Sequence, residues 1–123
     1  MYKGKKILIV DDSAVERHIL SEIAKDLGFE IFEAETGEEG ITKALECLPD
    51  LVLMDVVMPG INGFQATRKI TTTEQLKNTP VIMCTSKGQA TDKIWGQRQG
   101  ASAYVVKPIN KEELIGEIKK LMN

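Results

Sequence analysis

Short apolar runs alternate with longer stretches of helical periodicity along the whole chain. Five runs predict strands, namely "ILIV" (7–10), "EIFEA" (30–34), "LVLM" (51–54), "VIMC" (81–84) and "AYVV" (103–106). The first, third and fourth runs are continuously apolar, as expected for parallel strands that are covered on both faces. The run 30–34 alternates between polar and apolar residues, which indicates an edge strand.

The first helix is predicted over residues 14–27, with Ser13 as its N-terminal cap and Gly28 at its end. Apolar residues recur there every three or four positions, the spacing of one helix face. We expect that face to pack inward; its residues are Val15, Ile19, Leu20, Ile23 and Leu27.

Capping residues predict two further helices that each pack one face inward. Thr36 and Glu39 form a capping box before one helix, and Asn110 with Glu113 three residues on begins the last. Their apolar positions are Ile41, Ala44, Leu45 and Leu48, then Leu114, Ile115, Ile118, Leu121 and Met122.

Two weaker helices complete the series. Residues 63–70 follow the turn "PGING" and predict a short helix, and residues 87–99 predict another, which Gly88 and Gly96 weaken. Strands that alternate with helices give an α/β fold, a doubly wound sheet of five parallel strands with five helices on both faces. At 123 residues we expect one domain, 1–123. Such sheets bind ligands beyond the carboxyl ends of their strands.

Composition narrows the class of protein. Hydrophobic residues make up 42% and charged residues 28% of the chain, and no apolar run is long enough to span a bilayer. The start "MYKGKKILIVDD" does not resemble a signal peptide, so we expect a cytoplasmic protein without membrane insertion. The net charge of −2 argues against direct binding of nucleic acid. Cys47 and Cys84 lack metal-binding spacing and are expected to be reduced, buried thiols.

A polar residue follows each of four predicted strands. Asp11 and Asp12 follow 7–10, Asp55 follows 51–54, Thr85 follows 81–84 and Lys107 follows 103–106. One such residue alone is usually an ordinary loop residue. Because the carboxyl ends of parallel strands meet at one edge, however, these five side chains should converge on one pocket.

Three neighbouring carboxylates repel one another and require positive charge. Lys107 supplies one charge, and an oxygen-only set of ligands suits Mg²⁺. Zinc is not expected, because the only histidine, His18, falls within the first predicted helix and reads as a surface residue.

These residue types fit phosphoryl transfer to a carboxylate. Asp55 would attack phosphorus as the nucleophile, while Mg²⁺ and Lys107 neutralise the phosphoryl oxygens and Thr85 hydrogen-bonds another of them. The apolar strand 51–54 then serves as a rigid mount for one reactive carboxylate that is open to solvent.

The chain resembles a known family, the CheY-like receiver domains of two-component response regulators. "ILIVDDS", "LVLMDVVMPGINGF", "VIMCTS" and "YVVKP" stand in the family's order, each at the end of a predicted strand. The resemblance covers the whole chain and implies the strand order 2-1-3-4-5. It also implies a stand-alone signalling protein that accepts phosphate from the phosphohistidine of a histidine kinase, and not an enzyme with a separate substrate.

The resemblance implies a metal site as well. Asp12 and Asp55 would ligate Mg²⁺ directly, with the backbone carbonyl of Val57 as a third ligand and Asp11 acting mainly through water. Lys107 would contact the phosphoryl group, and the Lys107–Pro108 peptide would be cis.

A switch is implied too. Thr85 would turn toward the phosphate and Tyr104 would turn inward behind it, which changes the surface of the fourth helix, fifth strand and fifth helix. Tyr104 also fits plain packing beside its valines.

Within the family, "NGFQATR", "TDKIWGQRQGA" and "YVVKP" most resemble the single-domain regulators of twitching-motility chemosensory systems, the PilH type. A downstream motility or signalling protein would then be the partner, and the chain itself a monomer or weak dimer. Trp95, with Lys93 and Arg98 around it, is the expected partner-contact aromatic. The alternative is a core tryptophan under the helix.

Two positions flank the line along which water would attack the phosphoryl group, and these are Val57 and Lys87. Valine has no group to orient water, so we expect the aspartyl phosphate to be hydrolysed slowly, unless Lys87 reaches the phosphate.

Three other functions would use a similar pocket or a similar sheet. A phosphate shuttle or sink for the kinase uses the same residues and stays open. A metal-dependent phosphatase would need a second aspartate where Val57 stands. A flavin or dinucleotide binder would not place the two negative charges of "DDSAVE" against a phosphate.

Overall fold

The computed structural model describes residues 1–122, and its centre is one parallel sheet in the order β2-β1-β3-β4-β5. All four neighbouring pairs are parallel. The strands are β1 (Lys6–Val10), β2 (Glu30–Ala34), β3 (Leu51–Met54), β4 (Val81–Thr85) and β5 (Ala103–Val106). The predicted fold class and the family's strand order are therefore confirmed, and β1 and β4 are each one residue longer than predicted.

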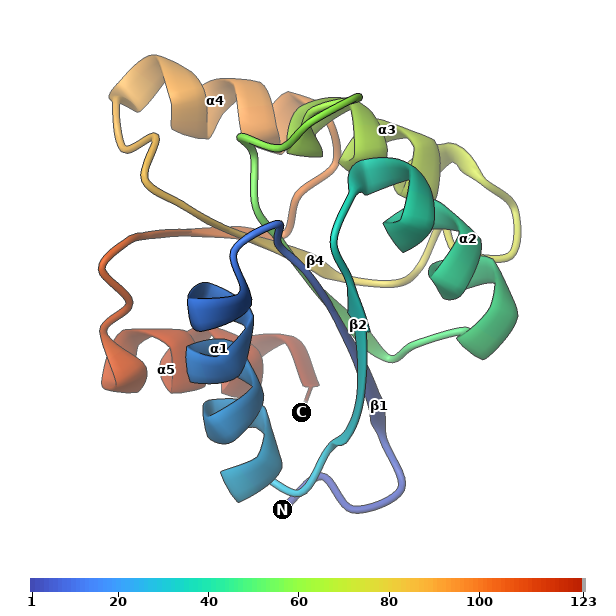
Figure 1. The fold of residues 1–123 in the computed structure, drawn as a ribbon, viewed down its shortest axis with the longest axis vertical. Helices are drawn as coiled ribbons and strands as arrows, with labels where there is room; N and C mark the ends of the chain where they lie inside the picture. Colours follow the sequence, from blue (N-terminus) through green and yellow to red (C-terminus); the bar gives the residue numbers. More distant parts are fainter. Residues whose placement is uncertain (123) are drawn as a thin grey trace.

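Five helices cover the two faces of the sheet. They are α1 (Ala14–Asp26), α2 (Gly37–Cys47), α3 (Gly63–Thr72), α4 (Ala90–Arg98) and α5 (Lys111–Met122). Helices α1 and α5 lie on one face, and α2, α3 and α4 lie on the other (Figure 1). Two apolar cores result, one on each face. No helix within residues 1–122 is long and apolar enough to cross a membrane.

The helix starts follow the predicted caps with one change. Ser13 accepts a hydrogen bond from the N–H of Glu16, and Asn110 accepts one from Glu113. Thr36 likewise accepts from the N–H of Glu39. A capping box would also need the Glu39 carboxylate to accept the backbone N–H of Thr36. Among the described residues, this carboxylate accepts the N–H of Glu35 instead.

The buried faces of α1 and α2 are narrower than the sequence predicted. Val15 is 70% exposed, and Ile19, Leu45 and Leu48 are exposed as well. Apolar spacing alone does not say how much of a helix face a sheet covers. In α2 the close contact is made by small residues, since a Cβ at Gly40 would lie 2.9 Å from Val10.

Helix boundaries also differ from the prediction. α3 runs to Thr72, two residues past the predicted end, and α4 starts at Ala90 instead of residue 87. The backbone before α4 serves other contacts, since the carbonyl of Lys87 accepts the Tyr104 hydroxyl. Cys84 is buried as expected, whereas Cys47 is only partly buried, and both thiols are free.

Candidate functional site: an acidic pocket at the carboxyl edge of the sheet

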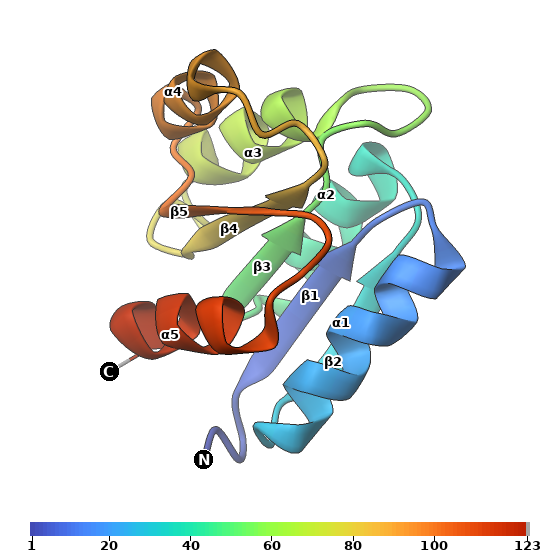
Figure 2. The ribbon, with the colours of Figure 1, turned by 90° about the vertical axis from the view of Figure 1, so that its left-hand side faces the viewer.

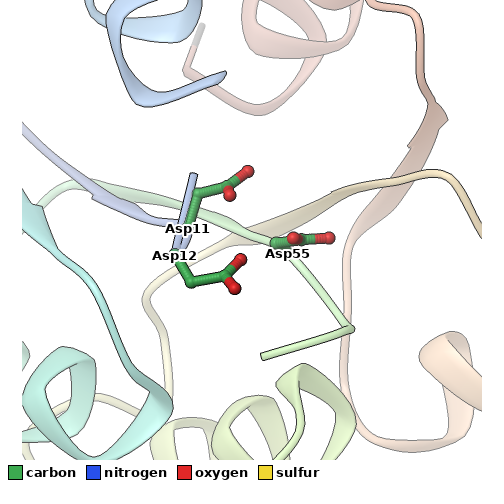
Figure 3. A group of neighbouring side chains, drawn as sticks. All are labelled: Asp11, Asp12 and Asp55. Atoms are coloured by element: carbon green, nitrogen blue, oxygen red, sulfur yellow. The ribbon is translucent and has the colours of Figure 1, made fainter. Parts of the chain in front are cut away.

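Three carboxylates meet beyond the carboxyl ends of β1 and β3. The strands point toward the same edge of the sheet (Figure 2), and each of Asp11, Asp12 and Asp55 offers an oxygen within 4.8 Å of the other two. Figure 3 shows Asp11 and Asp12 extending from the end of β1 beside Asp55 from the end of β3. Asp11 and Asp55 are buried and Asp12 is exposed, so the cluster meets solvent mainly through Asp12 and not, as predicted, through Asp55.

Lys107 brings the positive charge into this cluster from the end of β5. Its Nζ lies 2.6 Å from Asp11 Oδ2, 3.6 Å from Asp55 Oδ2 and 3.9 Å from Glu16 Oε2. The backbone N–H of Lys107 donates to the carbonyl of Thr85, which continues the β4–β5 pairing to the rim. The Lys107–Pro108 peptide is cis, as the sequence resemblance implied.

The electrostatics of Asp55 reflect its position. Burial raises its pKa, and the neighbouring Asp11 carboxylate raises it further. Lys107, the N–H of Val56 and the Thr85 hydroxyl act in the opposite direction, but the pKa stays above the ordinary value of an aspartate. A cation added to this pocket would therefore stabilise the ionised form of Asp55.

The pKa of Lys107 is also shifted by these neighbours. Burial lowers its pKa, but the hydrogen bond to Asp11 and the charges of Asp55, Asp11 and Glu16 raise it to a net value above that of a free lysine. Lys107 is therefore a fixed cation at neutral pH.

Thr85 and Tyr104 are the two residues that the sequence resemblance implies as a switch. Thr85 is buried at the end of β4, and its Oγ1 accepts a hydrogen bond of 3.4 Å from the N–H of Lys87. The Tyr104 hydroxyl donates to the carbonyl of Lys87 at 2.6 Å. Burial, followed by the charges of Asp92 and Asp55, raises the pKa of Tyr104 to about 12. The β4–α4 loop thus contacts both side chains.

The loop after Asp55 is fixed by backbone contacts. The N–H of Val56 donates to Asp55 Oδ1 at 2.8 Å, and the N–H of Gly63 donates to the Val56 carbonyl at 2.8 Å. A Cβ at Gly63 would lie 1.8 Å from the Asp55 carbonyl oxygen, so only glycine fits there. Val57 lies between these anchors and is 60% exposed.

Sequence reasoning missed Arg17. Its guanidinium donates to the backbone carbonyl of Asp11 at 2.6 Å and pairs with Glu33 and Glu35 at the end of β2. It thereby ties the Asp11–Asp12 turn to the edge strand. An arginine one turn into the helix that follows "DD" is the signal that could have indicated this role.

The three predicted partner-face residues do not share one groove. Lys93 lines a hollow between α4 and β5 that includes Tyr104, whereas Trp95 lines a different hollow between α3 and α4. Arg98 is exposed near the end of α4. Trp95 is 50% exposed, so the alternative of a core tryptophan is wrong. His18 is exposed on α1, as predicted.

The donor set of the pocket fits Mg²⁺. Three carboxylate oxygens come together without a thiolate or imidazole among the described ligands, and the exposed Asp12 leaves room for water. Burial and the Asp11 carboxylate raise the pKa of Asp55 in spite of the nearby Lys107, so a further cation in this pocket would favour the ionised carboxylate.

Comparison with known proteins identifies the class that this fold and site define. Residues 7–119 match the family model described as the response regulator receiver domain, and the chain belongs to this family. It is therefore a member of a two-component signalling family.

Several similar proteins belong to motility and chemotaxis systems. The chain is 46% identical to protein PilH of Pseudomonas aeruginosa over 95% of its own length and 97% of that protein. It matches the chemotaxis protein CheY4 of Vibrio cholerae with a TM-score of 0.89 and 33% identity, covering 95% and 98% of the two chains. It also matches a chain of the CheX–CheY–BeF3–Mg²⁺ complex of Borrelia burgdorferi, with a TM-score of 0.92, 27% identity and coverage of 98% and 91%. The chain spans about half the length of the curated transcriptional regulators that it also matches.

Proposed function

We propose that this chain is a stand-alone receiver that accepts a phosphoryl group on Asp55 from the phosphohistidine of a histidine kinase. The observation that carries this proposal is the position of the Asp55 carboxylate, which shares one pocket with Asp11, Asp12 and Lys107. The proposal treats residues 1–123 as one receiver domain that acts in a cytoplasmic motility or chemosensory pathway, in keeping with its likeness to PilH and CheY4.

Each residue has a defined part in the proposed reaction. The Asp55 carboxylate attacks phosphorus, the phosphorus–nitrogen bond to the kinase histidine breaks, and the imidazole leaves with the bonding electron pair. Strand β3 and the Val56 N–H hold the Asp55 carboxylate in place. Lys107 neutralises a phosphoryl oxygen and Thr85 donates its hydroxyl to another. Asp11, Asp12, Asp55 and the carbonyl of Val57 would hold Mg²⁺, which supplies charge neutralisation for the transferred group.

The switch follows from the same contacts. A hydroxyl of Thr85 that turns to the phosphoryl group gives up the Lys87 N–H, and Tyr104 holds the carbonyl of that same residue. Phosphorylation would then favour one arrangement of the β4–α4 loop because it binds that arrangement more tightly. The surface of α4, β5 and α5 would change its affinity for the downstream partner.

Phosphotransfer from a labelled histidine kinase or from acetyl phosphate tests the proposal. We expect Mg²⁺-dependent, acid-stable and base-labile labelling that Asp55→Asn abolishes. Asp26→Asn, an exposed carboxylate on α1 that faces Lys111, is the matched control and should label normally. Labelling of the Asp55→Asn variant at the parent level would disprove the assignment.

A further inference from the structure

A hollow of about 370 Å³ lies between the start of α3 and α4. It lies on the other side of α4 from the Lys93–Tyr104 hollow and is lined by Asn62, Phe64, Gln65, Arg68, Trp95 and Gln99. Trp95 and its neighbour Ile94 are each about half exposed. A half-exposed tryptophan beside a hollow leaves apolar area that a partner side chain can cover.

The polar groups of this groove are mainly donors. Asn62 and Gln65 cap α3 reciprocally, because each side-chain oxygen accepts the other residue's backbone N–H. Backbone N–H groups require the amide oxygens at those positions, so the amide NH₂ groups are left for a ligand. Arg68 and the indole N–H of Trp95 have no acceptor capacity at all. The groove therefore suits a ligand rich in acceptors.

The charge around the groove points the same way. The groove lining carries the positive charge of Arg68 and no carboxylate, in a chain whose formal net charge is −2. Asp92, the one acidic residue of α3 and α4, accepts the N–H of Gln89 and pairs with Lys87 at 3.9 Å, away from the groove lining. Donors, positive charge and an apolar anchor position together match a negatively charged peptide.

We propose that the α3–α4 groove docks an acidic peptide segment of a partner protein, with one apolar or aromatic side chain covering Trp95. The segment's carboxylates and carbonyls accept hydrogen bonds from Arg68 and from the amides of Asn62 and Gln65. The apolar side chain packs on Trp95 and Phe64. This site is distinct from the α4–β5–α5 surface of the proposed switch.

Backbone contacts connect the groove to the phosphate-accepting pocket. The N–H of Gly63, next to Asn62 and Phe64, donates to the Val56 carbonyl, and the N–H of Val56 donates to Asp55. On the other wall, Gly96 lies between the Tyr104 and Phe64 rings, since a Cβ there would lie 3.1 Å from the first and 3.5 Å from the second. Phosphorylation should therefore change the affinity of the groove, and this one statement rests on the proposed function.

A binding assay with defined probes tests the groove. The probe is a labelled 12-residue peptide of Asp and Glu around one Leu and one Phe, followed by anisotropy and by the emission of Trp95, the only tryptophan of the chain. We expect saturable binding with a blue shift of the Trp95 emission. Arg68→Gln and Trp95→Ala should each weaken binding about tenfold, or about 1.4 kcal/mol. Lys93→Gln, which lies in the other hollow, should leave binding unchanged.

Several results would overturn the docking proposal. These are the absence of saturable binding, equal binding of a peptide whose acids are replaced by amides, and a loss with Lys93→Gln as large as that with Arg68→Gln. Tighter, Arg68-dependent binding of phosphatidylglycerol vesicles or of a single-stranded oligonucleotide would also reject a peptide as the occupant. Circular dichroism confirms that each variant is folded.

The effect of phosphorylation on the affinity of the groove is measured separately. Peptide affinity is measured before and after treatment with acetyl phosphate and Mg²⁺, while labelling of Asp55 is measured on the same samples. Labelled protein with unchanged affinity contradicts the coupling alone. Unlabelled protein contradicts the proposed function and leaves the result for the groove intact.

Discussion

Lys107 Nζ lies 2.6 Å from Asp11 Oδ2, a contact between residues 96 positions apart that closes the acidic pocket across the sheet. Both side chains are largely shielded from water, with exposures of 12% and 1%. Removing one member of a buried ion pair leaves the other charge uncompensated, which typically costs about 3 kcal/mol or more. The pocket's stability in the absence of metal should therefore depend on this lysine.

Replacement of Lys107 tests that dependence. Lys107→Met should lower the free energy of unfolding by about 3 kcal/mol in urea with chelator present, and Mg²⁺ should restore part of the loss. Lys111→Met removes an exposed lysine that faces Asp26 and should change stability by at most about 0.5 kcal/mol. Equal stability of the Lys107 variant and the parent would show that the pocket does not need its fixed cation.

Asp55 should make stability depend on pH. Its folded pKa is raised, so its favourable contribution is complete below the ordinary aspartate pKa and is lost as the pH rises through the folded value. Asp55→Asn should therefore be more stable than the parent at pH 7 without metal, by on the order of 1 kcal/mol. The difference should shrink on acidification. The measurement is urea denaturation at several pH values with chelator present. A stability difference between Asp55→Asn and the parent that grows toward low pH would contradict the raised pKa of Asp55.

Arg17 should hold the Asp11–Asp12 turn in the conformation that binds Mg²⁺. Arg17→Ala removes the donor to the Asp11 carbonyl and the pairing with Glu33 and Glu35. We expect weaker Mg²⁺ binding by calorimetry and a stability loss of about 1–2 kcal/mol. The neighbouring exposed residue offers the matched control, and His18→Ala should bind Mg²⁺ like the parent. Unchanged Mg²⁺ affinity in Arg17→Ala would limit the residue to a structural role.

Val57 should slow hydrolysis of the aspartyl phosphate. Val57→Asn places an amide that can orient water, and we expect phosphate release from labelled protein to accelerate several-fold, where each factor of ten corresponds to about 1.4 kcal/mol. Lys87, which pairs with Asp92 at 3.9 Å, is removed as Lys87→Ala in parent and variant to separate its effect. An unchanged or slower rate in both backgrounds would refute the hypothesis.

Gly63 should tolerate no side chain. Gly63→Ala forces a Cβ against the Asp55 carbonyl, and the backbone of the pocket must shift, at a cost of about 3 kcal/mol or more. Gly116→Ala in α5 is the control, because a Cβ there meets nothing within 4 Å and alanine favours a helix by up to about 1 kcal/mol. Urea denaturation should show a lower free energy of unfolding for Gly63→Ala and a higher one for Gly116→Ala.

Much of the architecture was determined by local pattern. Continuous apolar runs predicted the buried strands β1, β3 and β4, and an alternating run predicted the edge strand β2, because the side-chain period of a strand reports which faces are covered. The other edge strand, β5, was not predicted as an edge. Polar residues at strand ends predicted the acidic pocket, since parallel strands bring their carboxyl ends to one edge. Asp11, Asp12, Asp55, Thr85 and Lys107 all lie there.

Only the tertiary structure decided what depends on contacts between distant segments. The exposure of Val15 and Leu48 depends on how far the sheet extends under each helix, which periodicity does not report. The contacts of Arg17 require the end of β2 to lie beside the start of α1. The two separate hollows beside α4 require β5 to lie on one side of this helix and α3 on the other. Local sequence encodes the spacing of side chains, whereas their neighbours are set by the packing of elements far apart in the chain.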